Sequence, residues 1–310
     1  MAELPFEKRV TLGFKLMAGY YSGEISRDAI ERLPTRENVP WGTTQLEDAI
    51  NRMITTVLQD DHFKFWETWH SSIMDQMSDG VAINFILLLL KDWERKGRPT
   101  NPGAAQTRLF LKNARILLDR SVYEYVTKQW RGSSDSRIAS NLSGLNGQGP
   151  LFEKIADDRW DSLIREILEH GSIEGRSYLL SVDRSIKLLL LYMYVVTDID
   201  GPTEPNSEYD VDHIIPQSAF EASGDPLLEP FKNHIANLAL LPHRQNMNKS
   251  ARSLDELTEP WLKRQVVKYE GVQEADFPKY STAEQFGALK EFRSPRILEA
   301  LTTVRAARLG

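Results

Sequence analysis

Most of the chain places apolar residues at the three- and four-residue spacing of amphipathic helices. In the first two thirds of the sequence this spacing predicts helices over residues 7–21, 46–59, 63–77, 81–95, 108–130, 152–170 and 178–196. The same spacing returns over residues 261–269 and 283–308. Clusters of Gly, Pro and polar residues separate these segments. The pattern therefore predicts a mainly α-helical protein.

A different pattern occupies the stretch between the two helical regions. β-branched and apolar residues favour a short strand over residues 209–215 and a second strand over residues 238–241, each stopped by a proline. The stretch 220–232 between them predicts an inserted loop or a short extra helix. A helix is expected to start near Asn246 and to continue through residue 262. The sequence thus predicts a ββα unit embedded among helices.

Domain boundaries follow from composition. Residues 200–207 are rich in Gly, Pro and polar side chains, which marks a linker before the ββα unit. We predict a helical domain over residues 1–200, the ββα unit over residues 201–270, and a C-terminal helical segment over residues 271–310 that packs on the rest.

The ββα unit carries residues suited to phosphodiester hydrolysis. A histidine is the natural proton acceptor near neutral pH, and His213 follows Asp212 within the first predicted strand. Asp and Asn oxygens are hard ligands that suit Mg²⁺, and this assigns Asp212 and Asn246 as metal ligands. Asn237 is predicted to accept a hydrogen bond from the imidazole and so to orient the ring. Because adjacent strand residues point to opposite faces, Asp212 and His213 can meet at one ion only if the strand bends or ends there.

Several neighbouring residues keep two interpretations. Asp210 is predicted to support the site rather than to bind the metal, and Asn248 is a rival of Asn246 as the ligand. Lys249 is either a phosphate contact or a solvated helix lysine. His234 and His243 lie in the same segment, where they either contact DNA or have no role.

The segment 210–249 resembles the HNH, or ββα-metal, nuclease superfamily. Asp212-His213 matches the first motif of that family, Asn237 its central asparagine, and Asn246 its third, helix-borne position, with Asn in place of His. The run Tyr-Asp-Val-Asp-His-Ile-Ile-Pro-Gln-Ser is similar to the HNH domain of RNA-guided CRISPR effector nucleases. The phrases His-Ile-x-Pro and Asn-Leu-x-Leu-Leu are similar to the C-terminal nuclease domain of GmrSD-type modification-dependent restriction enzymes and of their phosphorothioate-sensing relatives in phage defence. The long helical region before the motif favours this second group.

The resemblance implies a DNA endonuclease that nicks or cuts phosphodiester bonds with Mg²⁺, or with Mn²⁺, as part of a restriction or phage-defence system. RNA as the substrate stays open, since the motif acts on a phosphodiester and not on the sugar. The alternative is a catalytically silent nucleic-acid-binding or regulatory module, against which the intact Asp-His-Asn-Asn set argues. GmrSD-type relatives carry an N-terminal sensor that hydrolyses nucleotides. Because no Gly-rich phosphate loop is visible here, such an NTPase region would belong to a larger parent chain.

Composition narrows the remaining possibilities. The chain has no cysteine, which excludes disulfides and a cysteine-based zinc site, so we expect no zinc. Its formal net charge is −6, but residues 231–310 carry 13 Lys and Arg against 9 Asp and Glu, which favours phosphate contact on that part. The N-terminus lacks a signal-peptide pattern, and the longest apolar runs are too short to span a bilayer. We therefore expect a cytoplasmic protein with no membrane partner.

Overall fold

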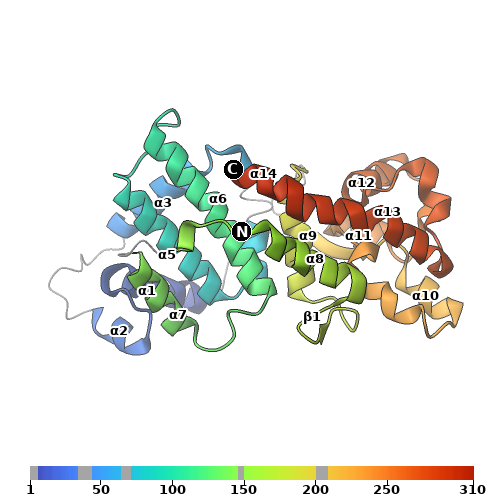
Figure 1. Ribbon diagram of the computed structural model, residues 1–310, viewed down its shortest axis with the longest axis horizontal. Helices are drawn as coiled ribbons and strands as arrows, with labels where there is room; N and C mark the ends of the chain where they lie inside the picture. Colours follow the sequence, from blue (N-terminus) through green and yellow to red (C-terminus); the bar gives the residue numbers. More distant parts are fainter. Residues whose placement is uncertain (1–5, 34–43, 64–70, 146–149, 200–208) are drawn as a thin grey trace. The chain divides into compact units, whose positions relative to one another are not determined.

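The computed structural model describes residues 6–33, 44–63, 71–145, 150–199 and 209–310. Contacts divide the chain into two compact units: unit 1, residues 1–155 with 309–310, and unit 2, residues 156–308. Helices make up most of both units, which confirms the mainly α prediction (Figure 1). The linker predicted over residues 200–207 lies outside the described residues, and unit 2 extends on both sides of it.

Unit 1 is built around one buried helix. Its helices are α1 (Phe6–Ser22), α2 (Arg27–Glu31), α3 (Thr44–Val57), α4 (Ser71–Gln76), α5 (Asp79–Arg95), α6 (Ala105–Val126) and α7 (Ser134–Gly144). The helices α1, α3, α6 and α7 all contact α5. Residues 87–90 of α5 are four consecutive buried leucines, and a helix that is apolar around much of its circumference is expected at the centre of a bundle.

Unit 2 holds the predicted strands. Its elements are α8 (Asp157–His170), β1 (Ser172–Ile173), β2 (Arg176–Ser177), α9 (Arg184–Val196), β3 (Tyr209–His213), α10 (Gln217–Ser223), β4 (Leu238–Pro242), α11 (His243–Lys249), α12 (Pro260–Glu270), α13 (Phe286–Glu299) and α14 (Arg305–Leu309). The strands β3 and β4 pair antiparallel, with Tyr209 opposite Pro242 and His213 opposite Leu238. The helix α11 follows β4 directly, so a ββα arrangement is present.

Helices enclose the β3–β4 ribbon and satisfy its backbone. Both α9 and α12 contact β4. The Tyr194 hydroxyl of α9 accepts a hydrogen bond from the Leu240 N–H at 3.1 Å and donates to the Tyr269 carbonyl of α12. The buried Arg293 guanidinium of α13 donates to the Leu238 carbonyl at 2.8 Å. The ribbon is therefore held by side chains of helices far away in the sequence.

Two predicted helices differ most from the structure, and part of the helix predicted over residues 63–77 lies outside the described residues. The helix expected from Asn246 to residue 262 is two helices, because α11 ends at Lys249 and α12 begins at Pro260. Ser250 causes the break, since its φ of 53° lies in the left-handed region that no α-helix continues through. The helix expected over residues 178–196 begins at Arg184, where the Asp183 side chain accepts hydrogen bonds from two backbone N–H groups of the first turn.

The predicted inserted stretch contains both short helices and turns. The helix α10 begins at Gln217, after a short turn that follows β3, and a 3₁₀ helix is present at Glu229–Asn233. This second short helix ends beside the strands, so it brings Asn233 close to the end of β3.

Candidate functional site

Two carboxylates of β3 face the helix α11. Asp210 and Asp212 are two residues apart in a strand and therefore share one face. Asn246 and Lys249 are three residues apart in α11 and therefore share one side of the helix. The pairs match: Asp210 contacts Asn246, and Asp212 contacts Lys249. Strand and helix periodicity thus bring four of the predicted residues together.

The outer pair forms a small polar cluster with a histidine. The Asp210 Oδ2 atom lies 2.7 Å from His243 Nδ1 and 3.2 Å from Asn246 Nδ2. The side chains of Asp210 and His243 are 34% and 55% exposed, so water reaches both. The amide of Asn248 is exposed and donates to the Arg244 carbonyl on its own helix. The structure therefore brings Asn246, and not Asn248, to the carboxylate.

The inner pair is a buried ion pair. Lys249 is fully buried, and its ammonium contacts the Asp212 carboxylate, the Glu270 carboxylate at 3.3 Å and the His213 carbonyl at 2.9 Å. Burial opposes the charged form, but the two carboxylates outweigh it and raise the pKa of Lys249 above its usual value. Both interpretations kept for Lys249, a phosphate contact and a solvated helix lysine, are therefore wrong, because this buried lysine binds the two carboxylates inside the unit.

Glu270 is a member of the site that sequence reasoning missed. It is the last residue of α12 and is buried, and this burial raises the pKa of its carboxyl, an effect that Lys249 opposes. A glutamate at the end of an amphipathic helix is normally a surface residue. Only the pairing with Lys249 across the fold distinguishes it, and that contact leaves no local signal in the sequence.

His213 lies at the end of β3 and contacts residues other than Asp212. Its Nε2 atom is 3.1 Å from the Asn233 Oδ1 atom and 3.0 Å from the Gln217 side-chain nitrogen. The Asn233 amide nitrogen donates to the Leu179 carbonyl at 3.1 Å, which fixes the amide with its oxygen toward the ring. His213 Nε2 thus lies between the Asn233 oxygen and the Gln217 side-chain nitrogen, and these two contacts hold the ring in place. Burial lowers the pKa of His213, so the ring is neutral at neutral pH.

Asn237 has a structural position instead of the predicted contact with the imidazole. Its side-chain oxygen accepts from the Ile215 N–H at 2.9 Å, and its nitrogen donates to the Ile215 carbonyl at 3.0 Å and the Lys232 carbonyl at 2.9 Å. These bonds occupy the amide and close the turn after β3. Asn233, four residues earlier, contacts the imidazole instead. Both residues are buried asparagines in one short stretch, so the sequence alone could not separate them.

His234 is buried and structural. Its Nδ1 atom accepts from the Ala236 N–H at 3.0 Å, and its Nε2 atom is 2.9 Å from the Leu168 carbonyl. Burial lowers the pKa of His234 to about 4. The DNA contact left open for this residue is thus excluded by its burial, whereas His243 is at the surface beside Asp210.

The chemistry of the outer cluster fits a hard divalent cation. Asp210 and Asn246 supply oxygen atoms and His243 a ring nitrogen, all next to water, and Mg²⁺ takes few protein ligands and keeps several waters. Across the described ranges, no three His, Asp or Glu side chains converge as a metal-binding group. A cation here would therefore depend on the Asn246 amide. Asp212, the predicted metal ligand, is less suited to bind a cation than Asp210, because the Lys249 ammonium already neutralises its carboxylate.

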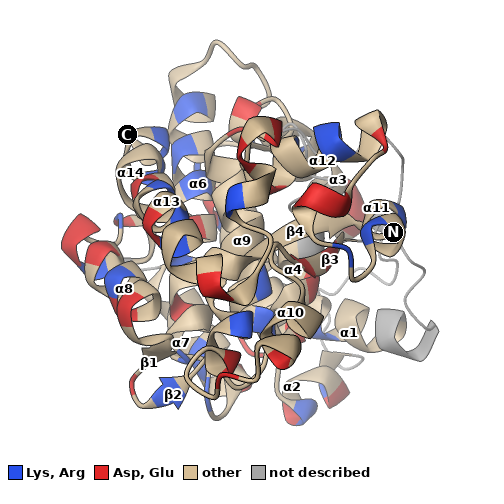
Figure 2. Cartoon of the chain, turned by 90° about the vertical axis from the view of Figure 1, so that its right-hand side faces the viewer, with Lys and Arg blue, Asp and Glu red and all other residues tan. Residues whose placement is uncertain are grey.

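Charges on unit 2 are mixed. Figure 2 shows Lys and Arg interspersed with Asp and Glu along α8 and α13. Individual basic side chains near the site would therefore attract a phosphate to this unit, because the unit has no large surface of positive charge among its described residues.

Comparisons with protein-family models, curated proteins and solved structures found no match to the chain. No helix in the part of the chain that the structure describes is long and apolar enough to cross a membrane.

Proposed function

We propose that the chain is a metal-dependent endonuclease of the HNH type that hydrolyses DNA phosphodiester bonds at the β3–β4–α11 site. The observation that carries this proposal is the cluster of Asp210, Asn246 and His243 where β3 meets α11, on a strand that ends at a neutral His213 in contact with Asn233. The resemblance of residues 210–249 to GmrSD-type nuclease domains supports DNA as the substrate and restriction or phage defence as the setting. RNA is the alternative substrate.

His213 is the proposed general base. Its lowered pKa keeps the imidazole unprotonated at neutral pH, as a base requires. The contact with Asn233 holds the ring in place, and the unprotonated ring nitrogen would take the proton from the attacking water. Asn233 is therefore a positioning residue, the role that the sequence assigned to Asn237.

Asp210 and Asn246 are the residues that would hold Mg²⁺ or Mn²⁺, with His243 beside them. A bound cation would stabilise the negative charge on the phosphate and on the leaving oxygen. Asp212 is the second candidate ligand, since it lies on the same face of β3. It could bind a metal only if Lys249 released it.

A catalytically silent nucleic-acid-binding module is the second candidate function. The observation in its favour is the neutralisation of Asp212 by Lys249, because a fixed ammonium beside the site repels a cation. Cleavage measurements separate the two candidates directly.

The decisive experiment is cleavage of supercoiled plasmid with Mg²⁺, with Mn²⁺ and with EDTA. The His213→Ala variant should lose cleavage by about 10²- to 10⁴-fold while its melting temperature stays close to that of the wild type. Metal-independent nicking, or full activity in His213→Ala, would refute the proposal.

Two pairs of variants assign the metal ligands. Asn246→Ala should raise the metal concentration needed for half-maximal activity more than Asn248→Ala, its matched control on the same helix. Asp210→Asn should raise this metal concentration more than Asp212→Asn. The opposite order would show that Asp212 is the metal ligand.

A further inference from the structure

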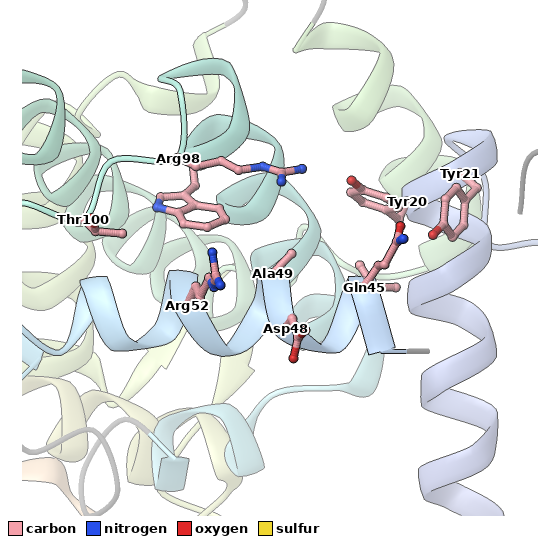
Figure 3. Close-up of a pocket in the computed structure, with 10 residues that line it drawn as sticks. Tyr20, Tyr21, Gln45, Asp48, Ala49, Arg52, Arg98 and Thr100 are labelled. Carbon is pink, nitrogen blue, oxygen red and sulfur yellow. The ribbon is translucent and has the colours of Figure 1, made fainter. Parts of the chain in front are cut away.

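Tyr20 of α1 lines two cavities of unit 1. The first has a volume of about 450 Å³ and is lined by residues of α1, α3 and the end of α5, with Tyr20 at one side (Figure 3). The second has a volume of about 610 Å³ and is lined by residues of α1, α5 and α7. Both volumes lie in the range of small-molecule sites, roughly 300–1,000 Å³.

Basic side chains line both cavities. Lys91 and Arg95 are one turn apart on α5 and line the second cavity. Arg98, in the turn that ends α5, and Arg52, from α3, line the first. Each cavity has two basic residues against one carboxylate among its lining residues. An anionic ligand is therefore favoured in both, although the excess of positive charge is small.

Hydrogen bonds hold the residues between the cavities in place. The Tyr20 hydroxyl and the Arg98 guanidinium both donate to one oxygen of Glu94, each at 2.7 Å. Burial and Glu94 raise the pKa of Tyr20 to about 12, so the phenol stays neutral. Arg98 has a φ of 57°, and its N–H donates to the Trp93 carbonyl at 2.9 Å. A non-glycine residue in this left-handed conformation is uncommon and is held there by its surroundings.

The wall formed by α3 adds hydrogen-bonding groups. Gln45 and Arg52 are seven residues apart and so lie on one side of the helix. Figure 3 shows both reaching from α3 toward the side on which Tyr20 and Arg98 lie. A glutamine amide can donate to and accept from the edge of a base, while two guanidinium groups suit a phosphate.

We propose that the two cavities bind consecutive nucleotides of a single-stranded nucleic acid, with one base packing against Tyr20. An aromatic ring beside basic side chains is the combination by which proteins hold single strands with little sequence preference. The Lys91 ammonium lies 4.0 Å from the centre of the Tyr20 ring and covers one of its faces, so a positive charge for a phosphate lies directly beside the ring. All these residues belong to unit 1, and the proposal therefore does not rest on cleavage by unit 2.

The test is fluorescence anisotropy of the full chain with labelled single-stranded oligonucleotides of about ten nucleotides, in EDTA. DNA and RNA are measured in parallel, and binding of either one supports the proposal. Tyr20→Leu should weaken binding about tenfold, and Tyr20→Phe, which keeps the ring, should bind like the wild type. Arg52→Gln should lower the slope of log K against log salt by about 0.7, the value for one phosphate contact on a single strand.

The matched control is Arg27→Gln. Arg27 is also an exposed helix arginine of unit 1, paired with Glu31, but it does not line either cavity. Equal salt slopes for Arg52→Gln and Arg27→Gln would overturn the proposal, as would equal affinities of Tyr20→Leu and Tyr20→Phe in folded proteins. A free mononucleotide that binds as tightly as the oligonucleotide would overturn the assignment to a strand.

Discussion

Replacing Lys249 by methionine tests whether the buried ion pair holds unit 2 together. The change keeps the length of the side chain and removes its charge. Asp212 is only 4% exposed, so the substitution leaves its buried carboxylate beside Glu270 without a cation. It also removes the ammonium that donates a hydrogen bond to the His213 carbonyl. We therefore expect a large loss of stability.

The magnitude follows from burial. Removing one partner of a buried ion pair costs about 3–5 kcal/mol, because the remaining charge stays desolvated. In a unit of this size each 1 kcal/mol lowers the melting temperature by about 2–4 °C. Lys249→Met should thus lower the melting temperature of unit 2 by roughly 6–20 °C.

Differential scanning calorimetry of the full chain measures the effect. Lys263→Met is the control, since it removes a lysine of the same unit whose partner, Glu274, is 60% exposed, and it should cost less than about 1 kcal/mol. Adding Asp212→Asn to Lys249→Met should restore at least about 1 kcal/mol, because the unpaired charge disappears. A Lys249→Met variant as stable as the control, or a double variant no better than the single one, would refute this account of the site.

Three other predictions follow from buried polar groups and from backbone strain. The folded pKa of His234, about 4, lies below the usual 6.5, so the unfolded state binds the extra proton and stability falls as pH drops from 6.5 toward 4. Urea titrations should show that the wild type loses about 2 kcal/mol more stability than His234→Gln between pH 8 and pH 5, and equal losses would contradict this account. Asn237→Ala should cost about 3 kcal/mol through the unsatisfied backbone groups of its turn, and an unchanged melting temperature would contradict its structural role. Ser250→Gly should raise stability by about 0.5–1 kcal/mol in the same titrations, because glycine adopts the φ of 53° without strain; a loss would argue against that strain.

The elements of the fold were largely predictable because periodicity is a local property. Helical spacing located α1, α3, α5, α6, α8 and α12 within a few residues, and β-type runs located β3 and β4. The hairpin of β1 and β2 was missed, since each strand has only two residues. Its turn, Glu174-Gly175, has positive φ at both positions, which is a two-residue hairpin geometry with a weak signal in sequence.

The positions of the site residues could be predicted only where the regular geometry of one strand or one helix determines which way their side chains point. The spacing of Asp210 and Asp212 on β3, and of Asn246 and Lys249 on α11, places four of the predicted residues on facing sides. The partners of these side chains depend on tertiary packing. Whether Lys249 is buried, whether Asn233 or Asn237 reaches His213, and whether Glu270 joins the site are decided by chain segments far apart in the sequence.

The enclosure of the β3–β4 ribbon also bears on solubility. A two-stranded ribbon has open edges whose unpaired N–H and C=O groups can recruit a strand from another molecule. On β4, the Leu240 N–H is capped by the Tyr194 hydroxyl, and the Leu238 carbonyl is capped by Arg293. Two side chains thus occupy positions that a third strand would need. The helices α9 and α13 therefore protect the protein from edge-to-edge aggregation at the strand that carries the most apolar sequence of the ribbon.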